Sequence, residues 1–431
     1  MRNIRFLAVI ITTVISACAN GEGRVAETGS GTAAAAEAER VRSGIEVLLT
    51  DSLHLVQGRR VGLLTNHTGV LVDPTAPSST ETPNLLSTID AIANAENVEL
   101  VALYGPEHGI RGEAEAGAHV ESGVDARTGV PIHSLYGATR RPTPEMLADV
   151  DILVFDMQDV GARFYTYPST MAYAMEAAAE NGIPFVVLDR PNPIRGDVVQ
   201  GTVLDPAYAT FVGLYPVPMR HGMTMGELAR MFVAEFGIDV ELHVVPMTGW
   251  RRDMAFDETS MPWVAPSPNM PTLASALAYP GTCLFEGTGL SVGRGTDQAF
   301  QWIGAPWLDG DALAERLNAY ELPGLRFESA SFTPREPGDG KFADTEVHGV
   351  RIVAESTTYD ASRAAVAMLI ETYSASGDEW SWLESHFDRL SGTDALRHAI
   401  EAGDGLDQIT GGWALPLADF ERFRAPYLIY D

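Results

Sequence analysis

VELVALYGPEHGIRG (residues 98–112) decides the fold class of this chain. Its first part, Val98–Leu103, is an apolar run of the kind that forms buried β-strands, and a polar turn ends it abruptly. In open α/β sheets, ligands bind at the edge where the strands reach their carboxyl ends. Glu107 and His108 can both exchange protons, and Arg111 can hold an anion. The stretch therefore predicts functional groups at the carboxyl edge of a sheet.

Similar apolar runs alternate with helical patterns from about residue 44 onward. The predicted strands are Arg60–Thr65, Val98–Leu103, Asp151–Phe155, Pro184–Leu188 and Val240–Val245. The predicted helices are Asn84–Ala95, Thr170–Glu180 and a helix that runs through Phe236 from the capping box Thr224-Met-Gly-Glu227. Continuous apolar strands are typical of sheets covered on both faces. The pattern predicts an α/β fold with a doubly wound, mainly parallel sheet and right-handed crossovers.

A proline-rich stretch over residues 262–282 marks the approach to a second, smaller domain. Beyond it, helical patterns cover Asp311–Leu317, Ser362–Thr372 and Asp394–Ala402, and short strand patterns cover Leu325–Phe327 and Arg351–Ala354. We therefore expect a first domain over residues 44–275 and a second domain of the α+β type over residues 276–431.

The overall charge restricts the partners of this chain. Its 431 residues carry a formal net charge of −29. Nucleic acids are poor candidates, because phosphate binding needs a basic surface. A small anionic substrate remains compatible with this charge, provided that a local cluster of arginines binds it against the acidic background.

The N-terminus has the pattern of an export signal. Arg2 and Arg5 precede the apolar stretch Phe6–Ile15, which is too short to span a bilayer. The segment ends in Ile15-Ser-Ala-Cys18, which resembles a bacterial lipoprotein signal in which the cysteine is lipidated; a plain secretory peptide is the alternative. We expect a signal over residues 1–18, a flexible tether over residues 19–43 and an exported cell-envelope lipoprotein, periplasmic or anchored in the outer membrane in a Gram-negative cell.

Polar side chains follow four of the predicted strands. Asn66, Glu107, Asp156 and Asp189 each come at or directly after a strand end. Because the carboxyl ends of parallel strands share one edge, these side chains are expected to face one crevice. Any one of them alone is as readily explained by a loop side chain that caps a helix. Four together favour a ligand site.

The residues around this crevice are suited to glycosidic bond cleavage. Two carboxylates that flank a glycosidic bond can act as an acid and as a base or nucleophile, and Glu107 could pair with Asp156, Asp159 or Glu286. Tyr165 and Tyr167 could stack on a sugar or donate hydrogen bonds. Arginines could bind a substrate carboxylate through paired N–H groups, or could pair with neighbouring aspartates instead. These arginines are Arg111, Arg163, Arg190 and Arg294.

Other chemistries find weaker support. The histidines His67, His108, His119, His133 and His221 are scattered, without a metal-ligand spacing such as H-E-x-x-H. Gly289-Leu-Ser291-Val-Gly293 matches the nucleophile elbow of serine hydrolases, but no apolar strand leads into it. No phosphate-binding glycine loop follows a strand, so no nucleotide is indicated. We expect neither a metal nor another cofactor.

Several of these motifs, taken together and in order, resemble the exo-β-N-acetylmuramidases of the NamZ type. The matching stretches are Leu63-Leu-Thr-Asn66, Pro106-Glu107-His108-Gly-Ile-Arg111-Gly112, Asp156-Met-Gln158-Asp159-Val-Gly-Ala-Arg163-Phe-Tyr165-Thr-Tyr167, Asp189-Arg190-Pro-Asn192-Pro193, Pro266-Ser-Pro-Asn269-Met-Pro271 and Phe285-Glu286-Gly-Thr-Gly-Leu-Ser291-Val-Gly-Arg294-Gly-Thr296. They cover most of residues 44–310. The C-terminal part after about residue 330 matches less clearly.

This resemblance implies a Rossmann-like catalytic domain, a smaller C-terminal domain that completes the cleft, and an activity. The expected reaction is removal of β-1,4-linked N-acetylmuramic acid from the non-reducing end of peptidoglycan fragments, in cell-wall turnover. Glu107 would be the general acid/base, with Asp156, Asp159 or Tyr165 as the second group. The residues expected to bind or position the sugar are Asn66, His108, Arg111, Gln158, Arg163, Tyr167, Asp189, Arg190, Asn192, Asn269, Glu286 and Arg294.

Two alternatives remain open at this stage. One is a serine esterase or amidase that uses Ser291. The other is a non-catalytic, sugar-binding lipoprotein that keeps the cleft without turnover. The carboxylates of the cleft favour catalysis, because a protein that only binds an anion gains nothing from carboxylates nearby.

Overall fold

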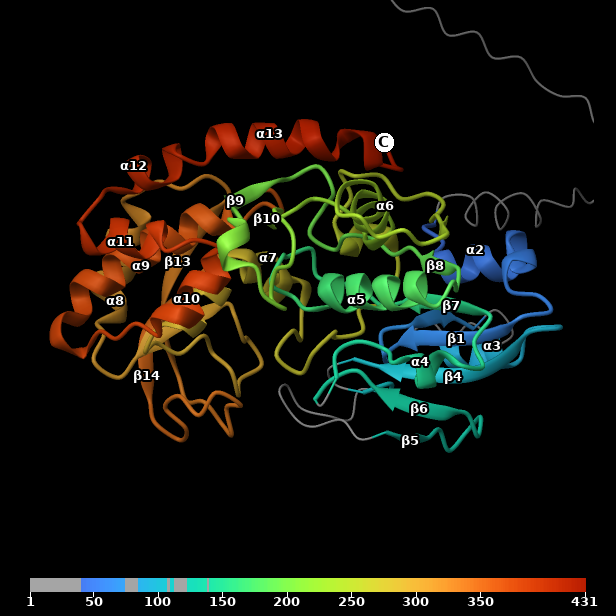
Figure 1. Ribbon diagram of the computed structural model, residues 1–431. Coiled ribbons are helices and arrows are strands. Elements are labelled where there is room, and N and C mark those ends of the chain that lie inside the picture. The colour runs from blue at the N-terminus through green and yellow to red at the C-terminus, as the bar shows by residue number, and fades with distance from the viewer. Residues whose placement is uncertain (1–39, 74–83, 107–108, 112–121, 138) are drawn as a thin grey trace, which may run out of the picture. The chain divides into compact units, whose positions relative to one another are not determined.

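A seven-stranded sheet forms the centre of the first half of the chain. The computed structural model describes residues 40–73, 84–106, 109–111, 122–137 and 139–431 (Figure 1). Along the sheet the strands follow the order β11-β8-β7-β1-β4-β6-β5. Their bounds are β1 Arg60–Thr65, β4 Glu99–Gly105, β5 Gly123–Val124, β6 Pro131–Ser134, β7 Ile152–Asp156, β8 Phe185–Leu188 and β11 Leu242–Val245. All neighbours pair in parallel except β5, which is antiparallel to β6.

Successive residues of the central strands enter two different cores. In β1, Leu63 belongs to one core and Leu64 to the other, and in β7 Val154 and Phe155 divide in the same way. Helices α2 (Gly44–Asp51) and α3 (Thr88–Ala93) contribute to the first core, and α5 (Tyr167–Glu180) and α6 (Met225–Glu235) to the second. Because side chains alternate along a strand, this division shows that the sheet is covered on both faces. The predicted α/β fold with a mainly parallel, doubly wound sheet is confirmed.

The predicted strands and helices match the structure with one substantial exception. The five predicted strands correspond to β1, β4, β7, β8 and β11, with small shifts at their ends. The prediction of one helix over Asn84–Ala95 was wrong at its start, because Leu85–Ser87 forms strand β3 against β2 (Val70–Val72). The helix begins after Ser87, whose hydroxyl accepts a hydrogen bond from the Asp90 N–H and caps it.

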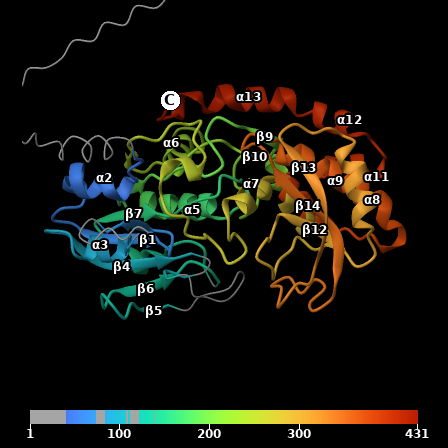
Figure 2. The same cartoon turned by 180° about the vertical axis from the view of Figure 1, so that it is seen from behind.

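The second half of the chain is built on a smaller antiparallel sheet with strand order β12-β14-β13 (Figure 2). These strands are β12 Trp302–Ala305, β13 Leu325–Phe332 and β14 Val347–Ala354. Strands β13 and β14 are longer than the fragments predicted, and β12 was not predicted. The accompanying helices are α7 Leu273–Thr282, α8 Gly310–Asn318, α9 Ala361–Ser376, α10 Glu384–Ser391, α11 Ala395–Glu401, α12 Leu406–Gly411 and α13 Ala414–Arg424. The smaller domain of the α+β type is therefore present.

Helix α7 lies inside the proline-rich stretch and packs closely on α9. A Cβ added at Gly281 would lie 2.0 Å from the carbonyl oxygen of Ala361, so only glycine allows this approach. Pro280, the residue before it, is buried within the helix. The stretch therefore connects the two sheets through a packed helix instead of an extended linker.

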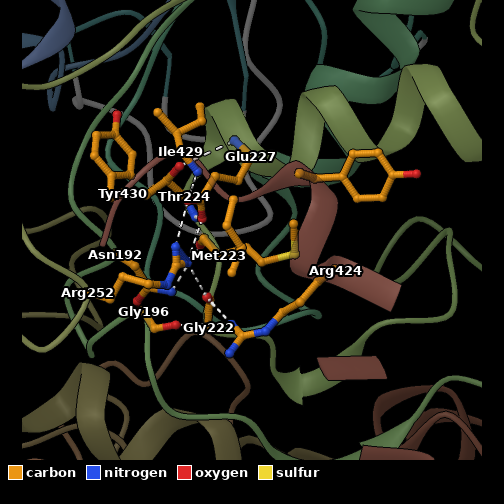
Figure 3. A network of polar contacts seen from close by, with 12 residues as sticks. Asn192, Gly196, Gly222, Met223, Thr224, Glu227, Arg252, Arg424, Ile429 and Tyr430 are labelled. Atoms are coloured by element: carbon orange, nitrogen blue, oxygen red, sulfur yellow. Dashed lines mark hydrogen bonds and ion pairs between the residues drawn. The ribbon is translucent and has the colours of Figure 1, made fainter. Parts of the chain in front are cut away.

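The end of the chain returns to the first sheet through a buried polar network (Figure 3). Arg252 binds the Glu227 carboxylate with both terminal nitrogens, at 2.6 and 2.8 Å. Glu227 also accepts hydrogen bonds from the backbone N–H groups of Thr224 and Ile429. The Arg424 guanidinium donates to the Gly196 carbonyl at 3.0 Å and also binds the Gly222 carbonyl. This network joins the start of α6 to the last turn of the chain.

The signal segment, most of the tether and three predicted functional residues lie outside the described residues. These three are Cys18, Glu107 and His108. Within the residues that are described, no helix is both long enough and apolar enough to cross a bilayer.

Replacement of Glu227 by glutamine should destabilise the protein strongly. The Glu227 side chain is fully buried, and its loss as an anion leaves the buried guanidinium of Arg252 uncompensated. Breaking a buried pair in this way costs about 3–5 kcal/mol of unfolding free energy. Urea denaturation of Glu227→Gln should show this loss. Glu241→Gln, which removes an exposed partner of His243, is the control and should change stability by less than about 1 kcal/mol.

Candidate functional site

The carboxyl edge of the sheet holds several of the predicted polar residues. Thr65 ends β1 and pairs in register with Asp156 at the end of β7. Asn66 follows Thr65 directly, and Asp189 follows β8. The strand order places β8, β7, β1 and β4 next to one another, so these ends share one edge. Strand β4 also ends here, at Gly105, two residues before Glu107, which lies outside the described residues.

Asp156 is held in a buried ion pair. The Arg190 guanidinium binds its two oxygens at 2.6 and 2.9 Å, and the Thr88 hydroxyl donates to the same carboxylate. Arg190 also donates to the Val70 carbonyl at 3.0 Å. The Asp156 side chain is 0% exposed and that of Arg190 is 2% exposed. These contacts favour a role in holding the edge together over direct contact with a substrate.

Asn66 and Tyr167 connect the edge to the loop before α7. The Asn66 side-chain amide donates to the Tyr167 hydroxyl at 2.6 Å, and that hydroxyl donates to the Pro266 carbonyl at 3.0 Å. The Asn66 side-chain oxygen Oδ1 accepts hydrogen bonds from the Thr68 N–H and hydroxyl. The side-chain orientation of Asn66 is thus set from both ends, and Tyr167 is fixed beneath the loop that carries Asn269.

Asp159 and Gln158 follow β7. Both side chains are buried, and not all of their polar atoms form hydrogen bonds. Asp159 accepts from the Gly161 N–H at 2.7 Å through one carboxylate oxygen, and Gln158 donates to the carbonyls of Asp159 and Pro191. Among the described residues, the other Asp159 oxygen and the Gln158 side-chain oxygen have no hydrogen-bond partner. Burial raises the pKa of Asp159 to about 7. Such a carboxyl group can both donate and accept a proton near neutral pH.

His221 faces Asp159 and was not singled out from the sequence as a site residue. Its Nε2 atom lies 3.9 Å from the Asp159 carboxylate, and its Nδ1 atom accepts from the Met223 N–H. The acceptor role of Nδ1 places the proton of the neutral ring on Nε2. Burial lowers the pKa of His221 to about 3, so the ring is neutral at physiological pH. Its position directly before the Thr224 capping box was the only sequence signal.

A pocket opens next to the start of α5, and the described residues that line it include neither Asp159 nor His221. Its empty volume is about 450 Å³ when the open solvent at its mouth is included. Its polar lining includes Tyr165, Tyr167, Ser267, Asn269 and Arg294, and Phe164, Met270, Tyr279 and Phe300 add apolar surface. The pocket therefore combines residues from both halves of the chain.

The walls of the pocket contain packed aromatic rings and the ion pair of Arg294 with Glu286. Tyr165 packs edge-to-face on Tyr167, with ring centroids 4.8 Å apart. Arg294 binds Glu286, with its Nε at 2.6 Å and one Nη at 2.5 Å from the same oxygen. Both side chains are 17% exposed, so the pair reaches the pocket without being open to bulk solvent. The guanidinium also lies 5.1 Å from the centre of the Phe300 ring.

Other predicted binding residues hold the scaffold. Arg163 is buried and donates to the carbonyls of Thr202, Val217 and Leu390, and burial lowers its pKa to about 9. Arg111 pairs with Asp125 at the edge of the sheet near β6. These partners favour structural roles for both arginines, and a substrate contact for either stays a prediction.

Asp189 and Asn192 shape the turn after β8. The Asp189 carboxylate accepts from the Thr224 hydroxyl, the Gly226 N–H and the Tyr430 hydroxyl at 2.7–2.8 Å. Asn192 donates to the Met223 carbonyl. A negative charge at the start of α6 is also favourable for the helix dipole. Both residues thus fix the start of α6 relative to the sheet.

Ser291 lacks the surroundings of a serine nucleophile. It forms a β-bridge with Gly304, is 2% exposed, and its hydroxyl accepts from the Gly293 N–H. A nucleophile elbow instead presents its hydroxyl at an exposed strand-to-helix turn. Within the described parts of the chain, no three His, Cys, Asp or Glu side chains gather as a metal-ligating group.

Comparison with known proteins gives a consistent family assignment over nearly all of the described chain. The family description "Exo-beta-N-acetylmuramidase NamZ, N-terminal" matches residues 61–274, and the corresponding C-terminal description matches residues 277–430. A protein of Bacillus subtilis (strain 168), the peptidoglycan beta-N-acetylmuramidase NamZ, is 47% identical over 397 residues, or 92% of each chain.

Two solved structures share this fold. Both are DUF1343 family proteins of Bacteroides fragilis NCTC 9343. One is 37% identical with a TM-score of 0.82 and covers 91% of this chain and 100% of its own. The other is 30% identical with a TM-score of 0.70 and covers 91% of this chain and 99% of its own.

The elevated pKa of Asp159 should make stability depend on pH. The folded state holds the proton of Asp159 up to about pH 7, whereas the unfolded chain releases it near pH 4. This contribution is therefore fully present below pH 4 and is lost as the pH rises through 7. Asp159→Asn should remove a slope of at most about 1.4 kcal/mol per pH unit in this window. If the unfolding free energies of variant and parent, measured by urea denaturation, depend on pH in the same way, the raised pKa of Asp159 is wrong.

Proposed function

The chain belongs to the exo-β-N-acetylmuramidase NamZ family, and we propose that it removes N-acetylmuramic acid from the non-reducing end of peptidoglycan fragments. The observation that carries this proposal is the position of Arg294 in the wall of the pocket beside α5. N-acetylmuramic acid bears a lactyl carboxylate, which distinguishes it from other amino sugars of similar size. A guanidinium is the preferred partner for a carboxylate. In a chain of net charge −29, an arginine in the pocket favours a ligand that carries a carboxylate over one that does not.

The remaining pocket groups suit the rest of this sugar. Tyr165 provides a ring and a hydroxyl group, and Asn269 and Ser267 can exchange hydrogen bonds with ring hydroxyls or with the N-acetyl group. Glu286 uses one carboxylate oxygen for two nitrogens of Arg294, and a guanidinium has five N–H donors in all. The ion pair therefore orients Arg294 and leaves it donors for an acidic ligand.

In the proposed reaction, Glu107 protonates the oxygen of the leaving sugar as the glycosidic bond breaks. The oxocarbenium-like centre is then captured on its opposite face by water, whose proton a second group takes, or by that group itself. In the second case water then hydrolyses the glycosyl-enzyme, and Glu107 takes the proton of that water. Asp159 is the favoured second carboxyl group, because its pKa near 7 lets it change protonation state at working pH. Asp156 is less suited, since Arg190 and Thr88 already occupy its two oxygens. Tyr165 remains the non-carboxylate candidate at the pocket wall.

The cellular setting follows from the N-terminal pattern and stays a proposal. Export through a signal that ends at Cys18 would place the enzyme in the cell envelope, beside peptidoglycan. Soluble muropeptides released during wall turnover would then be its substrates. A lipid on Cys18 and the tether after it would leave the pocket free to reach them.

The proposal predicts that Glu107→Gln loses activity without loss of structure. Glutamine keeps the shape of the side chain but cannot donate the catalytic proton. Turnover of a chromogenic β-N-acetylmuramide should fall by about 10²–10⁴-fold, with an unchanged melting temperature. Glu99→Gln, at the exposed start of β4, is the control. Near-parental turnover in Glu107→Gln would exclude Glu107 as the general acid/base. If the parent binds the muramide without cleaving it, a non-catalytic sugar-binding protein is favoured instead.

A second prediction concerns recognition of the lactyl carboxylate. Arg294→Gln should raise KM for a β-N-acetylmuramide by about tenfold or more, because a charged hydrogen bond to the substrate is lost. Any activity on the matching β-N-acetylglucosaminide, which lacks the lactyl group, should change much less. Arg316→Gln removes an arginine that pairs with Glu371 on the second domain and serves as the control. Equal effects on both substrates would show that Arg294 does not read the carboxylate.

A further inference from the structure

We propose that Lys341 is a positioning residue that holds Arg294 and Glu286 at the pocket wall and so sets the affinity for an acidic ligand. Lys341 lies in the loop of residues 333–346, between β13 and β14, and does not line the pocket itself. It acts through the backbone of the segment that carries the ion pair. The identity of the ligand rests on the proposed function, but the positioning role does not.

The Lys341 ammonium is enclosed by carbonyl oxygens of one turn. Its Nζ atom donates to the carbonyls of Thr288 and Leu290 at 2.8 and 2.9 Å, and to those of Phe285 and Glu286 at 3.2 and 3.4 Å. An ammonium has three donors, so the four carbonyls share them. Hydrogen bonds from a charged donor are about twice as strong as neutral ones. Lys341 thus fixes the backbone on both sides of Glu286.

The residue type at this position is itself informative. The chain contains 28 arginines and one lysine, which is Lys341. A guanidinium presents its donors in a flat fork that suits carboxylates, whereas a compact ammonium can be surrounded by oxygens from several directions. The contacts of Lys341 are of the second kind. Lysine thus occurs at a position where carbonyl oxygens surround the cation.

The same loop holds the other end of the segment. The Arg335 N–H donates to the Gly295 carbonyl at 3.0 Å, directly after Arg294. Gly295 has φ +76°, and a Cβ there would lie 2.3 Å from the Arg335 carbonyl oxygen, so the contact requires glycine. Phe342 anchors the loop by packing edge-to-face on Trp307, with centroids 5.7 Å apart. The loop therefore forms hydrogen bonds at both ends of residues 286–294.

The hydrogen bonds of Lys341 and Arg335 to this segment have a direct consequence for the pocket. Glu286 orients the Arg294 guanidinium, and Lys341 orients the turn from which Glu286 projects. The Lys341 ammonium binds backbone carbonyls, and the Glu286 carboxylate binds Arg294. A shift of this turn would therefore move Arg294, the cation that lines the pocket, and weaken the attraction for an anionic ligand group.

The first test needs no substrate. Amide hydrogen exchange of peptides that cover residues 283–296 should be accelerated at least about tenfold in Lys341→Met, which keeps the side-chain length but removes the ammonium. Lys341→Arg should restore only part of the protection, because its fork cannot meet the four carbonyls. Arg316→Met removes a cation elsewhere on the second domain and should leave these peptides unchanged. Unchanged exchange in Lys341→Met would overturn the proposal, whatever the enzyme cleaves.

The second test separates positioning from general stability. On a β-N-acetylmuramide, Lys341→Met should raise KM by about tenfold while kcat changes less, since a binding group is displaced and the reacting groups are not. A uniform fall in the amount of active enzyme, with KM unchanged, would show a merely structural role and overturn the proposal. If the parent enzyme neither binds nor cleaves the muramide, the proposed function fails, and the exchange result still decides the role of Lys341.

Discussion

The arrangement of the site depends on one buried ion pair, between Arg190 and Asp156. It joins the end of β7 to the turn after β8, and through Val70 and Thr88 it also reaches the β2 strand and the start of α3. Charges this deeply buried are tolerated only when both partners are fully hydrogen-bonded. The pair therefore forces four segments into one geometry at the edge of the sheet. The position of Asn66, which binds the pocket residue Tyr167, follows from that geometry.

Much of the first sheet was predictable, because its strands are continuous apolar runs. Such runs leave few alternatives when both faces of a sheet are covered, and polar turns marked their ends clearly. Leu85–Ser87 escaped prediction because three residues cannot show a period, and pairing with β2 outweighed their helical pattern. The second domain was harder to predict, since β12 spans four residues and the helices are mostly short.

The candidate site divides the predicted residues into two groups that the sequence could not separate. Tyr165, Tyr167, Asn269 and Arg294 line the pocket, whereas Arg163 and Asp189 satisfy carbonyls, hydroxyls and helix ends within the scaffold. Both groups are polar residues of the motifs that predicted the site, and only burial and partners distinguish them. His221 and Lys341 were missed because their contacts join segments distant in the sequence. The Lys341 contacts, for example, span more than fifty residues.

The contact between Asp189 and Tyr430 has a consequence for the order of folding. The carboxylate at the end of β8 receives one of its hydrogen bonds from a hydroxyl 241 residues later in the chain. During synthesis, the first sheet can collapse around its apolar strands, but this hydrogen bond at its polar edge cannot form until Tyr430 has been synthesised. The completed edge of the sheet therefore depends on a segment made long after its strands.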